Sequence, residues 1–235
     1  MSYDLEKVIV ALDTSEEETA LNLVKLLKNK ISTFKVGLEL FCSQGPSIVK
    51  KITNEGCKVF LDLKFHDIPN TVAGAARAAT KTGAYMFNVH ASGGREMMEK
   101  AREAANQIDS DTKPIILGVT VLTSIDQKDL IDINITESPI NQVITLAKLT
   151  KESGLDGVVA SPKEISAIRK ATGEDFLIVT PGVRPNWATK GDQKRVMTPA
   201  EALDVGASYI VVGRPVTAAR DPVEALDKLF ETTYD

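Results

Sequence analysis

Short runs of apolar, mostly β-branched residues recur along the chain, and longer amphipathic stretches separate them. The runs occupy residues 8–13, 33–37, 58–64, 86–91, 114–122, 157–161, 176–181 and 209–214. Within most runs consecutive residues are apolar, which is typical of strands that are buried on both faces of a parallel sheet. The pattern therefore predicts eight buried parallel strands.

The stretches between the runs have the periodicity of amphipathic helices. In residues 16–28 the apolar side chains fall on one helical face, and Thr14 and Ser15 are placed to cap its first turn. Further helices are predicted over residues 71–82, 95–107, 140–153, 162–171, 199–205 and 222–230. Strands and helices thus alternate along the chain.

The number of these units limits the choice of fold. A strand, a helix and two short loops take about 25 residues, so eight units fit within the 235 residues. We expect an α/β protein with a single (β/α)8 TIM-barrel domain over residues 1–235. A doubly wound open sheet is the alternative, although the phosphate-binding pattern G-x-G-x-x-G is absent after the first run. Two long connections, residues 123–139 and 182–198, follow the ends of predicted strands, where barrel active sites form.

Composition and charge narrow the class of protein. Hydrophobic residues make up 43% and charged residues 26% of the chain, which is typical of a globular protein. A net charge of −4 argues against a nucleic-acid partner. Cys42 and Cys57 cannot build a disulfide framework or a zinc cluster. We find no targeting or membrane segment, so we expect a cytoplasmic protein without a membrane partner.

The third predicted strand carries charged residues in an apolar setting. Asp62 and Lys64 are two positions apart and therefore point to the same side, and Asp67 follows at the strand end. Their apolar neighbours belong against the helices, so the charges are predicted to face the barrel interior. A structural ion pair is the alternative, but buried charges are costly unless they are used or fully paired.

Two further charged residues fall on neighbouring strands. Lys35 interrupts the second run and is expected beside Asp62, where it would extend an alternating chain of lysines and aspartates. A lysine whose amine reaches solvent is the alternative. Asp13 ends the first run, where it is equally suited to bind a ligand hydroxyl or to cap the next helix.

The last two strands are followed by residues that suit a phosphate. Gly213 allows the backbone to approach a ligand closely, and Arg214 can donate two hydrogen bonds to a phosphate. Arg184 and Gln193 lie in the connection 182–198 and are predicted to close over the ligand. Solvated surface charges are the alternative for each arginine alone, but together they indicate a small phosphorylated substrate.

The segment F-L-D-L-K-F-H-D-I-P-N-T-V, residues 60–72, resembles the signature D-x-K-x-x-D-I-P-x-T of the orotidine 5′-phosphate decarboxylase family. The likeness extends along the chain through V-A-L-D, F-K-V-G-L-E-L, N-V-H-A, T-P-G-V-R-P and V-G-R-P-V-T. It implies a carboxy-lyase that converts orotidine 5′-monophosphate to uridine 5′-monophosphate and CO2, the last step of de novo UMP biosynthesis. It also implies that neither a cofactor nor a metal takes part.

The resemblance further implies roles for particular residues. Lys35, Asp62, Lys64 and Asp67 would form the catalytic tetrad, with Lys64 as the proton donor to C6 of the pyrimidine. Asp67, Ile68 and Thr71 would reach the neighbouring site of a homodimer. The residues implied to bind substrate are Asp13, Lys35, Asp62, Ile68, Thr71, Thr123, Pro181, Arg184, Gln193, Gly213 and Arg214.

Two other functions are compatible with a barrel of this kind. Related sugar-phosphate decarboxylases and hexulose-phosphate synthases share the D-x-K-x-x-D strand but need Mg²⁺, which a cation at Lys35 would oppose. A non-catalytic nucleotide-binding barrel would keep Arg214 and Gln193 and would not need the tetrad. Lys35, Asp62, Lys64 and Asp67 together favour the metal-free decarboxylase.

Overall fold

The computed structural model describes residues 3–109, 113–188 and 197–231. Its strands form one closed parallel barrel in which each strand pairs with the next along the chain and β8 pairs with β1. The strands are β1 (Val8–Ala11), β2 (Thr33–Gly37), β3 (Lys58–Phe65), β4 (Met86–His90), β5 (Ile115–Val119), β6 (Gly157–Val159), β7 (Leu177–Pro181) and β8 (Tyr209–Val212). The predicted (β/α)8 barrel is therefore confirmed, and the open-sheet alternative is wrong.

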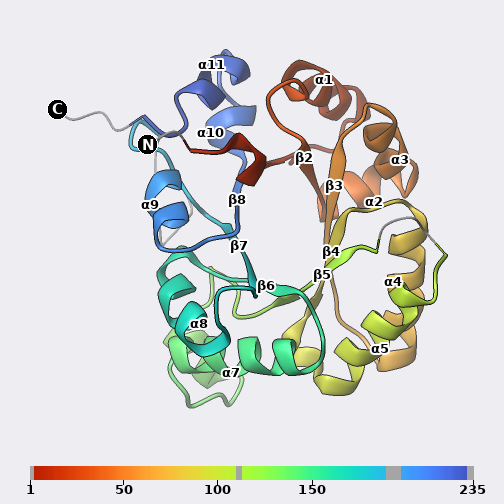
Figure 1. Ribbon diagram of the computed structural model, residues 1–235, viewed down its shortest axis with the longest axis vertical. Coiled ribbons are helices and arrows are strands. Elements are labelled where there is room, and N and C mark those ends of the chain that lie inside the picture. Colours follow the sequence, from red (N-terminus) through yellow and green to blue (C-terminus); the bar gives the residue numbers. More distant parts are fainter. Residues whose placement is uncertain (1–2, 110–112, 189–196, 232–235) are drawn as a thin grey trace.

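Helices surround the strands on the outside of the barrel, as the view in Figure 1 shows. The α-helices are α1 (Glu17–Leu27), α2 (Leu38–Gln44), α3 (Ser47–Asn54), α4 (Pro69–Lys81), α5 (Arg95–Asn106), α6 (Gln127–Asp132), α7 (Pro139–Glu152), α8 (Ile165–Thr172), α9 (Pro199–Asp204), α10 (Arg214–Thr217) and α11 (Pro222–Asp227). Short 3-10 turns lie at η1 (Leu5–Lys7), η2 (Ala91–Gly93) and η3 (Pro162–Glu164). Among the described residues, no helix is long and apolar enough to cross a membrane.

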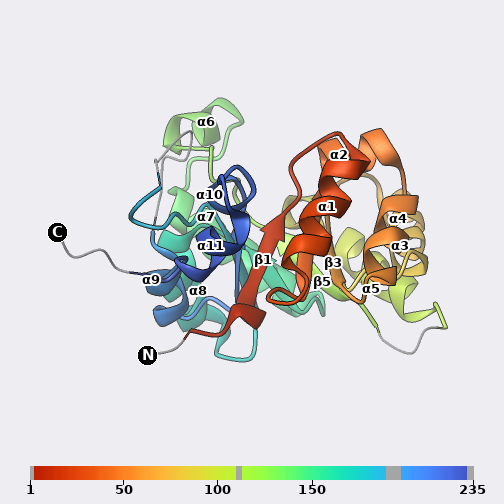
Figure 2. The same ribbon diagram turned by 90° about the horizontal axis from the view of Figure 1, so that it is seen from above.

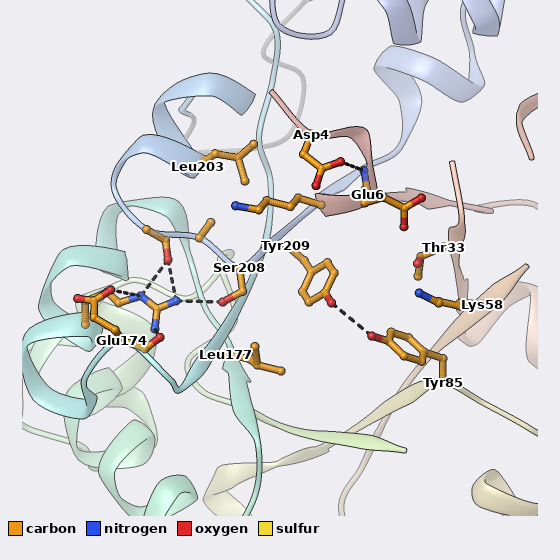
Figure 3. A pocket seen from close by; sticks show the side chains of 14 residues that line it. Asp4, Glu6, Thr33, Lys58, Tyr85, Glu174, Leu177, Leu203, Ser208 and Tyr209 are labelled. Carbon is orange, nitrogen blue, oxygen red and sulfur yellow. Dashed lines mark hydrogen bonds and ion pairs between the residues drawn. The ribbon is translucent and has the colours of Figure 1, made fainter. Parts of the chain in front are cut away.

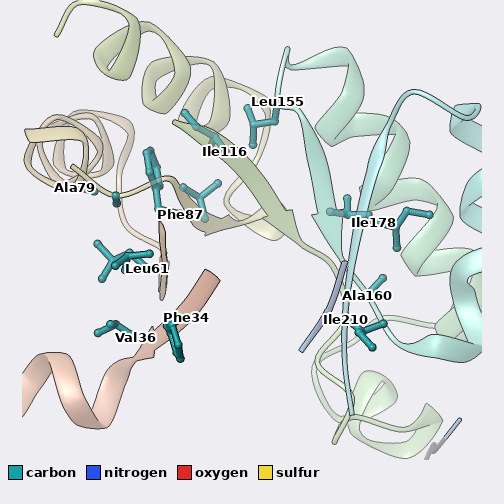
Figure 4. Close-up of a cluster of buried hydrophobic side chains, with 14 of the residues drawn as sticks. Phe34, Val36, Leu61, Ala79, Phe87, Ile116, Leu155, Ala160, Ile178 and Ile210 are labelled. Carbon is teal, nitrogen blue, oxygen red and sulfur yellow. The ribbon is translucent and has the colours of Figure 1, made fainter. Parts of the chain in front are cut away.

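Alternation along each strand produces two apolar layers. One set of side chains packs between strands and helices, including Leu61, Phe87 and Ile116, which are labelled in Figure 4. The opposite set fills the barrel interior, where Phe60 and Met86 are buried. Burying one such side chain stabilises the fold by about 1.5–3 kcal/mol. The interior is thus packed, so a ligand must bind at one of its ends.

The structure also corrects several predicted elements. The chain between β2 and β3 folds into α2 and α3, for which no helix was predicted. The connection 123–139 contains α6, and its Asp126 side chain caps that helix. The predicted cap of the first helix by Thr14 and Ser15 is wrong, because the N-cap residue is Glu16 and no side chain caps the helix. Short helices of one or two turns carry too weak a periodicity to be recognised in isolation.

The C-terminal ends of the strands meet at one end of the barrel. There, α2 follows β2 directly, α10 follows β8, and α6 belongs to the connection after β5. Figure 2 shows α2, α6 and α10 at the same end of the molecule. Side chains at these strand ends are therefore brought together although they are far apart in the sequence.

Candidate active site

Four charged side chains, one just after β1 and three on β2 and β3, form a continuous network at the C-terminal end of the barrel. The Lys35 Nζ lies 2.9 Å from Asp13 Oδ1 and 3.7 Å from Asp62 Oδ2. The Lys64 Nζ donates a hydrogen bond of 2.6 Å to Asp62 Oδ1. Acids and bases therefore alternate from β1 to β3. The predicted neighbourhood of Lys35 and Asp62 is confirmed.

The structure decides against one of the two roles predicted for Asp13, the capping of the next helix. Its carboxylate bonds to Lys35, whereas the first turn of α1 has no side-chain cap. A Cβ added at Gly37 would lie 2.9 Å from the Lys35 Nζ, and one at Gly213 would lie 3.3 Å from Asp13 Oδ2. Glycine at these two positions therefore leaves room for the ion pair between Asp13 and Lys35.

Asp62 is held in its ionised form. Burial by itself raises the pKa of the Asp62 carboxyl group, but the positive charges of Lys64 and Lys35 act in the opposite direction. Hydrogen bonds from Lys64 and from the Asn88 amide also stabilise the carboxylate, and together these groups hold the pKa of Asp62 below its usual value. A buried anion between two lysines is thus available to orient both ammonium groups.

A cavity of about 230 Å³ opens above this network. Its lining includes Lys35, Asp62 and Lys64 on one side, with Thr123 and Pro181 among the other lining residues. The apolar floor comes from interior residues such as Phe60. The cavity is therefore a mostly apolar pocket with charged groups at one wall, as is typical of small-molecule sites.

A second hollow lies where β7 and β8 end. It has a volume of about 460 Å³, and Arg184, Trp187 and Arg214 are among its lining residues. Arg184 comes three positions after the end of β7, and Arg214 begins α10 directly after Gly213. Two guanidinium groups at this position suit a phosphate or another anion.

Comparison with known proteins agrees with this geometry. The sequence model described as "Orotidine 5'-phosphate decarboxylase / HUMPS family" matches residues 6–229. The chain belongs to this family.

The relatives cover nearly the whole chain. An orotidine 5′-phosphate decarboxylase of Hydrogenovibrio crunogenus is 50% identical over 223 residues, which span 95% of this chain and 94% of that protein. One of Moorella thermoacetica is 53% identical over 225 residues, spanning 94% of this chain and 89% of that protein. The crystal structure of orotidine 5′-phosphate decarboxylase from Lactobacillus acidophilus has a TM-score of 0.85 at 41% identity, with 95% of this chain and 97% of that chain covered.

Three residues that the family resemblance assigned to a shared site lie outside the network. Asp67, Ile68 and Thr71 are exposed, and they lie between β3 and the first turn of α4. The Asp67 carboxylate accepts a hydrogen bond from the backbone N–H of Ile68 at 2.6 Å. Within the described part of a single chain, the fourth member of the alternating network is therefore Asp13, and Asp67 is not joined to it.

Gln193, the remaining predicted substrate-binding residue, lies outside the described residues. One residue that bonds directly to the network was not predicted, namely Asn88 on β4. Its side chain is completely buried and bonds to Asp62. The signal was present, because an asparagine in an apolar run with the parity of inward-facing Met86 needs a hydrogen-bond partner.

Two histidines border the site. The rings of His66 and His90 lie 5.2 Å apart. Burial, followed by the charges of His66 and Lys64, lowers the pKa of His90, while Asp62 acts in the opposite direction. His90 is therefore biased toward its neutral form. Among the described residues, no group of three or more histidine, cysteine or acidic side chains is arranged to hold a metal ion.

A cavity of about 520 Å³ lies at the opposite end of the barrel. Figure 3 shows Tyr85 and Tyr209 facing one another in it, with Lys58 close by. The two hydroxyl groups are 3.3 Å apart, and the Lys58 Nζ lies 4.9 Å from the centre of the Tyr85 ring. This cavity is larger than the one above Asp62, but several of its polar side chains, among them Tyr85, Tyr209 and Arg169, are bonded within the protein, so we place the active site at the C-terminal end.

Proposed function

We propose that this protein decarboxylates orotidine 5′-monophosphate to uridine 5′-monophosphate and CO2, the last step of de novo UMP biosynthesis. The observation that carries the proposal is the position of Lys64. Its ammonium group lies at the wall of the 230 Å³ cavity and is held by the buried Asp62 carboxylate. Family membership supports the same reaction.

The substrate would span the two hollows at the C-terminal end. Its phosphate suits Arg184 and Arg214, and its pyrimidine suits the cavity lined by Thr123 and Pro181. Asp13 and Lys35 lie at the edge of the network, where ribose hydroxyl groups would find a charged acceptor and a donor. Phosphate binding far from the reacting carbon can supply energy for closing and organising the site.

The chemical step needs a group that stabilises negative charge at C6. When the bond between C6 and the carboxylate breaks, the electron pair stays on C6 and CO2 leaves. Lys64 provides a positive charge at this point and then donates a proton from Nζ to C6, which forms the new C–H bond. Water returns a proton to Lys64. Asp62 holds the ammonium in place.

The same groups favour a reaction without a metal ion. The Lys35 ammonium occupies the space between the carboxylates of Asp13 and Asp62, where it neutralises the oxygen ligands that Mg²⁺ would require. We therefore assign no metal ion to the reaction.

The deciding experiment follows the loss of orotidylate absorbance with purified protein in the presence of EDTA. Turnover that persists in EDTA supports the proposal. Failure to consume orotidine 5′-monophosphate, together with Mg²⁺-dependent turnover of a hexulose phosphate, would assign the protein to the metal-dependent members of the family.

We further propose that the enzyme is a cytoplasmic homodimer in which Asp67, Ile68 and Thr71 complete the partner's site. Two exposed apolar side chains support a protein contact at this end, because Leu38 is 54% and Ile68 is 68% exposed. They follow the ends of neighbouring strands β2 and β3. The Asp67 carboxylate, which is exposed in the single chain, would then approach the partner's Lys64.

Mixing two inactive variants tests the shared site. In a heterodimer of Lys64→Ala and Asp67→Asn chains, one of the two sites would contain both native residues. Mixing under conditions that exchange subunits should therefore restore activity, while each variant alone stays inactive. A mixture as inactive as its components, although exchange is demonstrated, would contradict the shared site.

A further inference from the structure

Asn88 connects two members of the charged network, Asp62 and Lys64, through a single side chain. Its Nδ2 donates a hydrogen bond of 2.7 Å to Asp62 Oδ1, and its Oδ1 accepts one of 2.8 Å from the backbone N–H of Lys64. The side chain is completely buried in β4. Both ends of the Asn88 amide therefore bond to β3, at Asp62 and Lys64, the two residues that the proposed reaction places at the reacting carbon.

The contact lies where β3 departs from regular strand geometry. Leu61 pairs with Phe87 and Phe65 pairs with Val89, so the register between β3 and β4 shifts between Leu61 and Phe65. Lys64 lies within this bulge and has a φ of 51°, which is unfavourable for a residue with a side chain. Strained backbone of this kind persists only where the surroundings hold it.

The bulge also explains why an amide is needed. A bulged residue leaves the hydrogen-bond ladder, so its N–H needs another acceptor when it is buried. The Asn88 side chain provides this acceptor for Lys64 and simultaneously directs a donor at Asp62. An apolar residue of the same size would fill the space but would hold neither group.

We propose that Asn88 is a positioning residue for the decarboxylation, fixing the strained backbone of Lys64 and the carboxylate of Asp62 in one arrangement. This inference rests on the proposed role of Lys64 as proton donor. Asn88 acts through these two residues and has no role as a proton donor itself. If the Lys64 backbone relaxed to regular strand geometry, its ammonium would move away from C6, and a displacement of 1 Å can cost about 100-fold in rate.

The first test replaces Asn88 with leucine, which has a similar size and no hydrogen-bonding groups. We expect kcat to fall by about 100-fold while KM changes by less than about 3-fold, because binding groups elsewhere are unchanged. Thr150→Val is the matched control, since Thr150 is also completely buried and donates a hydrogen bond of 2.7 Å to Leu146 O. The control should lower stability without lowering kcat of the folded enzyme.

A second variant, Asn88→Asp, tests the donor separately. The introduced carboxyl group keeps an acceptor for the Lys64 N–H but repels Asp62 when it is ionised. Protonation restores a donor, so kcat of this variant should recover as pH falls while that of the wild type does not. A residue with only a structural role would not give this pH profile, and the variant decides the question if Asn88→Leu does not fold.

Measuring Lys64→Ala in parallel separates this inference from the proposed function. If Lys64→Ala is inactive while folded Asn88→Leu retains kcat within about 3-fold of wild type, the positioning role is wrong and the function stands. If Lys64→Ala itself turns over normally, the proposed role of Lys64 fails. The double variant should be no slower than Lys64→Ala alone, because Asn88 acts through Lys64 and through Asp62, whose proposed role is to hold that lysine. Independent, additive losses would overturn the inference.

Discussion

The two ends of the barrel carry cavities of opposite character. The N-terminal end has the larger cavity, about 520 Å³, with the Tyr85–Tyr209 pair and Lys58 in its lining. The C-terminal end has a cavity of about 230 Å³ above Asp13, Lys35, Asp62 and Lys64. The two ends differ in whether their charged groups bond within the protein or face an open cavity, and this difference matters more than the cavity volume.

At the N-terminal end the polar groups complete the structure. Arg169 illustrates this, because its guanidinium group donates to the backbone carbonyl of Gly206 and to the Ser208 hydroxyl group. At the C-terminal end, a strained lysine and a buried carboxylate are held against an open cavity. Buried charges and strained backbone are costly, so their concentration beside a cavity indicates function better than cavity size does.

The strongest test of this comparison removes one lysine from each end. Lys64→Ala should lower kcat/KM for orotidine 5′-monophosphate by at least about 10⁴-fold, because it removes both the proton donor and the positive charge at C6. Lys58→Ala is the control and should change kcat/KM by less than about 2-fold. Orotidylate absorbance measures both. Equal losses in the two variants would mean that the ends do not differ as described.

A smaller effect is expected from Gly37→Ala. The added Cβ would lie 2.9 Å from the Lys35 Nζ, so the ammonium group must move away from Asp13 and Asp62. We expect kcat/KM to fall by about 10-fold, equivalent to ~1.4 kcal/mol, with little change in stability.

The matched control for Gly37→Ala is Gly74→Ala in α4. Its added Cβ would lie 3.9 Å from an Arg77 nitrogen, which is ordinary contact. Alanine in a helix interior should raise stability by about 0.5–1 kcal/mol and leave turnover unchanged. Wild-type activity in Gly37→Ala would show that the position of Lys35 does not matter.

The pH dependence of stability should report on His90. Its pKa is lowered in the folded protein, so between that value and about 6.5 the unfolded chain binds more protons. This contribution to stability is complete above pH 6.5 and decreases as the pH falls through the folded pKa. In urea unfolding, His90→Gln should therefore lose less stability than wild type on acidification from about pH 7.5 to pH 5.

His66→Gln tests the electrostatic coupling between His90 and the neighbouring histidine ring. The electrostatic interaction with His66 lowers the pKa of His90, and this variant removes it. The NMR titration midpoint of His90 should therefore move upward in this variant. An unchanged midpoint would show that the two rings are not coupled.

The smallest effect belongs to the N-terminal end. Burial and the hydrogen bond with Tyr85 raise the pKa of Tyr209 to about 12. The neutral phenol is therefore favoured in the folded state, and its contribution to stability is lost as the pH rises from about 10 toward 12. Tyr209→Phe should lower the free energy of unfolding by about 0.5–1.5 kcal/mol at neutral pH and reduce the alkaline loss. Urea unfolding at neutral and at alkaline pH measures the two changes in stability. A fall in kcat would contradict a purely structural role for the N-terminal end of the barrel.

Much of the fold was predictable because local physical chemistry repeats along the chain. Eight apolar runs separated by amphipathic stretches indicated the barrel, and the structure closes it. Helices α2, α3 and α6 were not predicted, because short helices depend on tertiary packing more than on periodicity. Parity placed Asp62 and Lys64 on one side, and their ion pair agrees with that prediction.

The sequence by itself determined which residues are available for chemistry and on which strand ends they stand. Lys35, Asp62 and Lys64 are partly buried with their strands, and charges withdrawn from water need partners. Tertiary structure decided the further partners, since pairing of β1 with β2 brings Asp13 to Lys35 and pairing of β3 with β4 brings Asn88 to Asp62. It also decided the bulge that sets the backbone of Lys64, because an irregular register depends on two strands at once and leaves no periodic trace in either one.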